Sequence, residues 1–109
     1  KFRKIIDMLI KRVINEKNTI ESYYNSSNVL KSIYHEGTAD LDVVFKSGAV
    51  YRYRNVPPTV LIEFEHSKSQ GKFLNKKIRD NYSSTKVVNV NTQQLIEHIQ
   101  MLIEEKNKE

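Results

Sequence analysis

The chain has 109 residues, the usual length of a single domain, and it contains no cysteine. The lack of thiols excludes disulfide scaffolds, thiolate zinc sites, iron–sulfur clusters and cysteine nucleophiles, and it fits a cytoplasmic location. Eighteen basic against thirteen acidic residues give a net charge of +5, which favours an anionic partner, although a basic surplus also serves solubility alone.

Residues 2–17 are predicted to form an amphipathic helix. Phe2, Ile5, Leu9 and Val13 recur at steps of three or four residues, the spacing of one helix face. A basic amphipathic helix can lie on a membrane, but this apolar stripe has a better use against another helix. No apolar run approaches the ~20 residues that a membrane-spanning helix needs, so we expect no membrane partner.

A first strand at residues 29–34 and a β-hairpin at residues 40–54 should follow. In the hairpin, two stretches of alternating polar and apolar residues are separated by Lys46, Ser47 and Gly48. Glycine suits the left-handed last position of such a three-residue turn.

This turn fixes the register of the hairpin. Tyr51 and Tyr53 then lie on the apolar face, so we expect both rings to pack in the core, with hydroxyl groups that can reach the rim and meet a partner. On the other face Arg52 is opposed to Asp42, and Arg54 to Asp40, so both arginines should form cross-strand pairs. A paired arginine is a poorer anion ligand, and the two are therefore only secondary binding candidates.

Two short helices are predicted after the hairpin. Pro58 can open the first, which runs to about His66, because proline is tolerated in the first turn of a helix. Ser69 is a candidate N-cap for the second helix, which runs to about Asp80. A last amphipathic helix is predicted over residues 92–107.

These elements predict one α+β domain over residues 1–109. A three-stranded antiparallel meander packs with two short helices, and amphipathic helices flank it at residues 2–17 and 92–107. The terminal helices are apolar enough to pair with each other or with a second copy, so a homodimer or higher oligomer stays open.

The middle of the chain, from Ser27 to Tyr82, resembles the KTSC domain. This small module occurs at the C-terminus of some lysyl-tRNA synthetases and alone in bacterial and phage proteins. The residues that carry the resemblance by their order and spacing are Ser27, Tyr34, Leu41, Val43, Phe45, Gly48, Tyr51, Arg52, Tyr53, Val56, Pro57, Ser69, Gln70, Gly71, Phe73, Asn75, Ile78, Arg79 and Tyr82. The resemblance implies the predicted fold for residues 27–82. It suggests RNA binding for the family and implies nothing about the terminal helices.

A basic segment at residues 68–79 is the main candidate for ligand binding. Lys72, Lys76 and Arg79 are spaced by four and three residues and should share one helix face. The amide hydrogens of a helix start suit a phosphate, and glycine there allows close approach. The predicted phosphate-binding residues are Lys68, Ser69, Gly71, Lys72, Asn75, Lys76, Lys77 and Arg79, with Phe73 and Tyr82 as candidates for base stacking. The alternative is a solvated helix face with an ordinary N-cap.

No pattern for catalysis or for a cofactor is recognised. His35, His66 and His98 lie far apart in the sequence and have no spacing typical of a metal site. Phosphate-binding loops, nucleophile elbows and zinc-protease motifs are absent. We therefore expect a protein that is not an enzyme and needs no cofactor.

The sequence predicts a non-catalytic module that binds a phosphate-bearing ligand, with RNA or another nucleic acid first. One alternative is a phage-type accessory protein that sequesters a nucleotide signal as a homo-oligomer. The other is an adaptor that docks a protein partner through the terminal helices.

Overall fold

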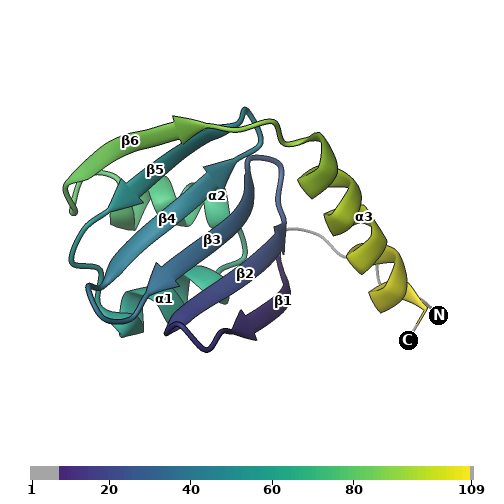
Figure 1. The fold of residues 1–109 in the computed structure, drawn as a ribbon, viewed down its shortest axis with the longest axis horizontal. Coiled ribbons are helices and arrows are strands. Elements are labelled where there is room, and N and C mark those ends of the chain that lie inside the picture. The colour runs from purple at the N-terminus through teal and green to yellow at the C-terminus, as the bar shows by residue number, and fades with distance from the viewer. Residues whose placement is uncertain (1–7, 109) are drawn as a thin grey trace.

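Six consecutive strands form one antiparallel sheet, in which each strand pairs with its neighbours in the sequence (Figure 1). The computed structural model describes residues 8–108. Its elements, in chain order, are β1 (Met8–Ile14), β2 (Thr19–Asn25), β3 (Val29–His35), β4 (Asp40–Phe45), β5 (Ala49–Tyr53), α1 (Pro58–Glu65), α2 (Gln70–Phe73), the π-helical turn η1 (Leu74–Ile78), β6 (Ser84–Asn89) and α3 (Gln93–Asn107). The α+β class is as predicted, but the sheet has six strands instead of three.

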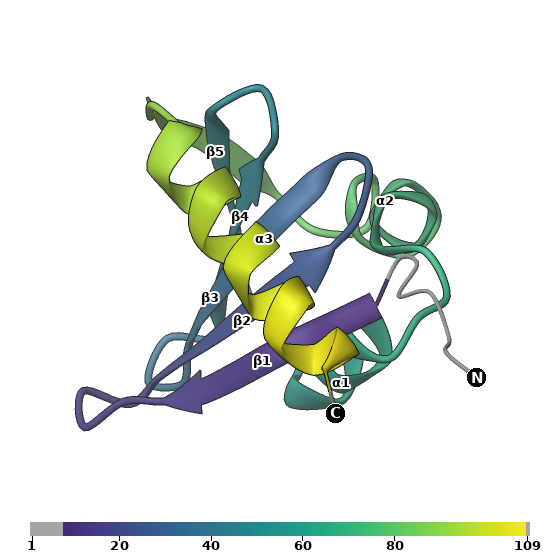
Figure 2. The ribbon, with the colours of Figure 1, turned by 90° about the vertical axis from the view of Figure 1, so that its right-hand side faces the viewer.

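Helices pack on both faces of the sheet. The crossover from β5 to β6 forms α1, α2 and η1, which lie behind the sheet in Figure 1, whereas α3 runs across β1, β2 and β3 (Figure 2). Successive side chains of a strand point to opposite faces. Tyr24 of β2 accordingly belongs to the core beneath α1, and its neighbour Tyr23 packs beneath α3.

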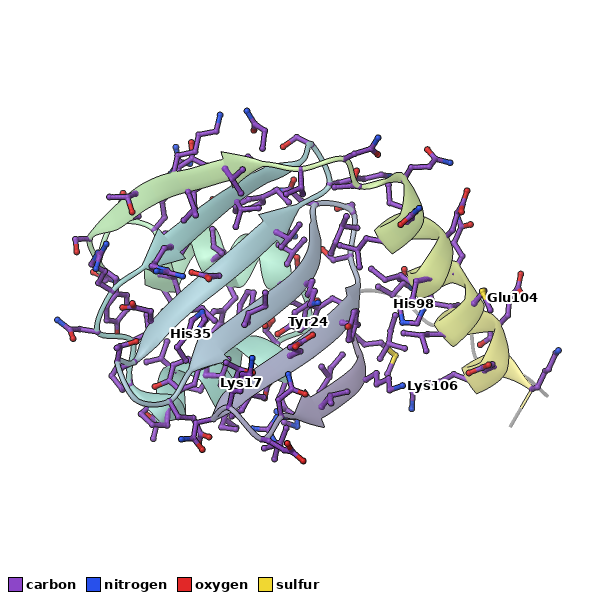
Figure 3. All side chains as sticks on the ribbon, in the orientation of Figure 1. Lys17, Tyr24, His35, His98, Glu104 and Lys106 are labelled. Atoms are coloured by element: carbon purple, nitrogen blue, oxygen red, sulfur yellow. The ribbon has the colours of Figure 1, made fainter. Side chains whose placement is uncertain are left out.

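The predicted C-terminal helix is confirmed as α3, and its apolar stripe packs on the sheet. Ile99 of α3 forms a cluster with Ile10 of β1 and Leu30 of β3. His98 points from α3 toward the sheet (Figure 3), where its ring meets that of Tyr23 edge-on with centroids 5.5 Å apart. The apolar stripe of α3, which was a candidate contact for a second copy of the chain, therefore packs within the domain.

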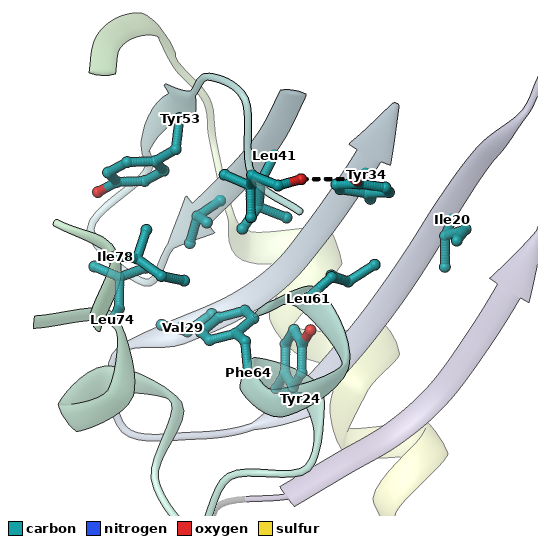
Figure 4. Packing of buried hydrophobic residues seen from close by; sticks show 12 residues of the cluster. Ile20, Tyr24, Val29, Tyr34, Leu41, Tyr53, Leu61, Phe64, Leu74 and Ile78 are labelled. Carbon is teal, nitrogen blue, oxygen red and sulfur yellow. Dashed lines mark hydrogen bonds between the residues drawn. The ribbon is translucent and has the colours of Figure 1, made fainter. Parts of the chain in front are cut away.

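The larger core lies between the sheet and the α1–η1 layer (Figure 4). Phe64 of α1 meets the ring of Tyr24 with centroids 5.4 Å apart. The Tyr24 hydroxyl shares a 2.7 Å hydrogen bond with Ser32, and burial raises the pKa of Tyr24. Tyr34 donates to the carbonyl of Val56 at 2.7 Å. Both tyrosines are buried with their hydroxyl groups satisfied, which is the usual condition for burying tyrosine.

The predicted helix at residues 2–17 is wrong for the part that the structure describes. Residues 8–14 form β1, while residues 2–7 lie outside the described ones. Because helices cover both faces of the sheet, the neighbours Leu9 and Ile10 pack into opposite layers, which removes the alternation that marks a strand. Asn18 has a φ of 61° and closes the β1–β2 hairpin.

The sixth strand was absent from the prediction. All residues of β6 are exposed at the edge of the sheet, so the strand lacks a buried face that alternation could reveal. Only the β-branched residues Thr85, Val87 and Val88 indicate it.

The predicted register of the β4–β5 hairpin is confirmed. Asp42 pairs with Arg52, and Val43 pairs with Tyr51. Gly48 has a φ of 100° at the end of the turn and accepts a 2.8 Å hydrogen bond from the amide of Val90. The hairpin turn is thereby attached to the segment that leads into α3.

We expect Gly48→Ala to lower the free energy of unfolding by about 2 kcal/mol. A Cβ atom there would lie 2.5 Å from the carbonyl oxygen of Val90, and alanine disfavours the positive φ. Gly37→Ala is the matched control, because a Cβ at Gly37 meets nothing within 4 Å. Urea unfolding followed by circular dichroism measures both variants, and equal stabilities would contradict the account.

A buried carboxylate joins α1 to the first two strands. Glu65 has a fully buried side chain, and both of its oxygens accept from Nε of Arg12 at 3.1 Å. Ser22 donates its hydroxyl to the same carboxylate at 2.5 Å. The Arg12 side chain is 32% exposed, so the pair bridges the core and the surface.

Arg12→Met should destabilise the fold by about 3 kcal/mol, because it leaves the buried charge of Glu65 without its cation. Lys31→Met is the comparison. It breaks a 2.9 Å pair with Glu21 in which both side chains keep contact with solvent, and it should cost at most about 1 kcal/mol. Denaturant midpoints test the difference. An Arg12 variant no less stable than the Lys31 variant would be inconsistent with the structural role of the pair.

Candidate nucleic-acid interface

The basic segment begins at a turn that the end of α1 holds in place. The predicted N-cap is confirmed, because the Ser69 hydroxyl oxygen accepts from the amide of Lys72 at 3.3 Å. Gln70 is fully buried, and its side-chain amide donates to the carbonyls of Ser67 at 3.2 Å and Phe64 at 3.4 Å. The sequence gives no signal for this role of Gln70, because a polar residue at the start of a short helix indicates neither burial nor its hydrogen-bond partners.

The start of α2 is a poorer phosphate site than the sequence predicts. Its Lys72 amide is already bound by the Ser69 side chain, and α2 has only four residues. Gly71 has room for a side chain, since a Cβ there would meet only the Cβ of Asn28 at 3.8 Å. Close approach of a ligand to Gly71 is therefore not indicated by its surroundings, and the side chains that follow are the better candidates.

The π-helical turn η1 divides the basic segment between two surfaces. The amide of Arg79 donates to the carbonyl of Leu74 at 2.8 Å, five residues back instead of four. Such a wide turn rotates the following side chains relative to a regular α-helix. Arg79 consequently lies with Asn75 beside one pocket, while Lys76 faces another, so the expected common face of Lys72, Lys76 and Arg79 is not formed.

Four lysines line a shallow hollow of about 220 Å³, which we call the lysine hollow. No acidic residue lines it, and none of the ion pairs between described residues involves its lysines. Phe73 contributes an apolar ring that packs against Phe64 with centroids 6.0 Å apart. The lining residues are Ser67, Lys68, Ser69, Lys72, Phe73, Lys76 and Lys77. The hollow thus combines exposed ammonium groups with an apolar floor.

A larger pocket of about 370 Å³, the hairpin pocket, lies between the β4–β5 hairpin and η1. Its aromatic residues are Phe45, Tyr51 and Tyr53, and its polar residues include Asn28, Asn75 and Arg79. The hollow and the pocket together contain every predicted phosphate-binding residue except Gly71.

The two tyrosines of β5 differ in their surroundings. Tyr53 is only 4% exposed, as expected for a core residue, and burial raises its pKa although the nearby Arg79 charge acts in the opposite direction. Tyr51 is half-buried and lines the hairpin pocket, where its ring meets Phe45 edge-on with centroids 6.0 Å apart. Tyr51 thus packs against the larger core, as predicted, and also lines the pocket.

The secondary candidates occupy ordinary structural positions. Arg52 donates to both carboxylate oxygens of Asp42, at 2.7 and 2.9 Å, as the hairpin register predicts. Arg54 is exposed, and the expected pair with Asp40 does not occur among the described residues. The two candidates for base stacking, Phe73 and Tyr82, are half-buried and pack against the larger core.

Asp42 also accepts a 3.0 Å hydrogen bond from His35, which lies on the sheet (Figure 3) and does not line the lysine hollow. Within residues 8–108, no group of three or more histidine, aspartate or glutamate side chains is arranged to hold a metal ion. In the same part of the chain, no helix combines the length and the apolar character needed to span a membrane.

Comparisons with known proteins agree with the resemblance seen in the sequence. The family model of the KTSC domain matches residues 25–82. The crystal structure of a KTSC domain protein from Yersinia pestis aligns with a TM-score of 0.56 at 22% sequence identity, covering 72% of this chain and 97% of that one. No curated protein matches the sequence. At this identity the structural match supports the shared fold alone.

The Asp42 carboxylate should make stability depend on pH in the acid range. Burial alone would raise its pKa, but the hydrogen bonds and charges of Arg52 and His35 outweigh burial and lower it below 3.8. A carboxyl whose pKa is lowered by folding stabilises the fold above its unfolded pKa, and this contribution is lost as the pH falls through the folded pKa. The wild-type protein should therefore lose more stability than Asp42→Asn between pH 5 and pH 2. Asp80→Asn, at an exposed carboxyl, serves as control and should follow the wild type; identical profiles for all three proteins would refute this role of Asp42.

Proposed function

The chain belongs to the KTSC domain family, and on this fold we propose that it is a non-catalytic module that binds a phosphate-bearing ligand, RNA or another nucleic acid first. The binding surface is the lysine hollow, with Arg79 at the neighbouring pocket. The proposal concerns side-chain charges and does not require the short α2 helix start.

The observation that carries the proposal is the grouping of four lysines without an acid. All four side chains are exposed, and their hollow contains no carboxylate. Contacts between such cations and phosphates release counterions from the nucleic acid, which supplies most sequence-independent affinity. Elsewhere in the domain the cations of Arg12, Lys31 and Arg52 are bound by carboxylates, so those positions offer less charge to a ligand.

The adaptor alternative has lost its structural basis in the described residues. It needs two free amphipathic helices, but residues 8–14 form a strand and the stripe of α3 packs on the sheet. The sequestration of a nucleotide by a homo-oligomer stays a separate prediction, as does a cytoplasmic location. A single copy of the chain already forms both the hollow and the hairpin pocket.

Reversing the charge of the lysine hollow should abolish most nucleic-acid binding. In the triple variant Lys72→Glu, Lys76→Glu, Lys77→Glu, we expect affinity for a labelled single-stranded RNA to fall at least about tenfold at low salt, because three phosphate contacts become repulsive. Fluorescence anisotropy measures the affinity.

The matched control is Lys17→Glu, Lys106→Glu, Lys108→Glu, which changes the net charge equally at exposed sites away from the hollow. Because long-range attraction depends on net charge, the control should lose some affinity but much less than the hollow variant. If both variants lost the same amount of RNA affinity, net charge alone would explain the loss, and the hollow would be refuted as the binding surface. Circular dichroism verifies that both variants are folded.

A further inference from the structure

The residues of the hairpin pocket suit a ligand that has a planar ring with hydrogen-bonding groups and an attached anionic group. The rings of Phe45 and Tyr51 form its aromatic wall, and Arg79 contributes a positive charge. No acidic residue lines the pocket. Aromatic side chains stack on nucleobases of any sequence, and a guanidinium group binds phosphate with several donors at once.

Three polar side chains of this pocket form no hydrogen bond or ion pair with other described residues. They are Asn28, Asn75 and Arg79. An amide group offers both a donor and an acceptor, which suits the edge of an unpaired base. The two asparagines lie on separate segments of the chain, one before β3 and one in η1, so a ligand between them would contact both sides of the pocket.

The size and fixed shape of the pocket limit its ligand. At about 370 Å³ it lies near the lower end of the range of roughly 300–1,000 Å³ for small-molecule sites, which accommodates one nucleotide rather than several. Gly48 fixes the hairpin turn against Val90, and Leu74 of η1 is buried in the core. Both walls of the pocket are therefore set by the fold before any ligand binds.

We propose that the hairpin pocket binds a single unpaired nucleobase, with Asn75 and Asn28 at its edge, Tyr51 at its face and Arg79 at the attached phosphate. This rests on the proposed function, since the flanking phosphates of the same strand contact the lysine hollow. The pocket and the hollow flank one helical segment, whose diameter with side chains is about 10 Å, so a few nucleotides of strand reach both. The wide turn of η1 makes this possible by directing Arg79 toward the pocket and leaving Lys76 at the hollow.

Comparing the binding of an intact RNA with that of an abasic strand that has the same number of phosphates separates base recognition by the pocket from phosphate binding by the lysine hollow. We expect the wild type to bind the intact strand more tightly, and Asn75→Ala and Tyr51→Leu to remove about five- to tenfold of that preference. Neither variant should change binding of the abasic strand, because the lysines are intact. Asn75 is exposed, so its replacement preserves the fold, and Tyr51→Phe is a matched control that keeps the ring and should retain most of the preference.

The outcomes distinguish the base site from the phosphate surface. If the wild type binds intact and abasic strands equally, or Asn75→Ala and Tyr51→Leu both keep the full preference, the base site is refuted while the lysine hollow stands. If neither strand binds, both proposals fail for nucleic acid. Titration with adenosine, guanosine, cytidine and uridine monophosphates shows whether the base comes from a free nucleotide or from an RNA strand. If the wild type binds a free nucleotide, the Asn75 variant does not, and no strand binds, the pocket is supported as a nucleotide site and its proposed role in RNA binding is overturned.

Discussion

The buried carboxylate of Glu65 is the interaction on which the attachment of α1 to the first two strands depends. Its carboxylate lies inside the fold, bound by Arg12 of β1 and Ser22 of β2, only a few residues before the lysines. An acid left at the surface there would weaken the positive potential of the hollow. Burying this carboxylate requires a cation, which Arg12 of β1 provides, because an unpaired charge in the core costs several kcal/mol. The β1–β2 hairpin therefore completes the core and keeps the Glu65 carboxylate from the surface, whereas Glu63 of α1 stays exposed.

The ion-paired lysines and arginines of the described residues lie on the sheet, although Lys86 of β6 is exposed there without an ion pair. On the sheet, carboxylates hold Arg52 and Lys31, and these residues stabilise strand register. The helical crossover instead exposes its cations, and the extra residue in η1 distributes them over two sides of one short segment. A regular helix would place Arg79 with Lys72 and Lys76 on a single charged face. The π-helical turn instead places Arg79 beside the aromatic hairpin pocket, so that a positive charge and aromatic rings line one site.

Local patterns predict only the parts of this fold that local chemistry determines. The β4–β5 register follows from alternation and Gly48, and the Ser69 cap follows from a preference of its residue type. The strand β1 could not be recognised, since its neighbours Leu9 and Ile10 pack on opposite faces and the helices that cover them lie far away in the sequence. The pairing of Arg12 with Glu65 likewise leaves no mark in the sequence, because the two residues lie 53 positions apart. The division of the basic segment depends on η1, for which no sequence signal was found.

The central claim is that unpaired cations of the crossover contact phosphates, and the salt dependence of wild-type RNA binding tests it most directly. For a single strand, the logarithm of the affinity falls with the logarithm of salt concentration by about 0.7 per phosphate contact. Four lysines and Arg79 acting together predict a slope of about −3 to −3.5. A slope near zero, or no measurable binding at low salt, would contradict the account.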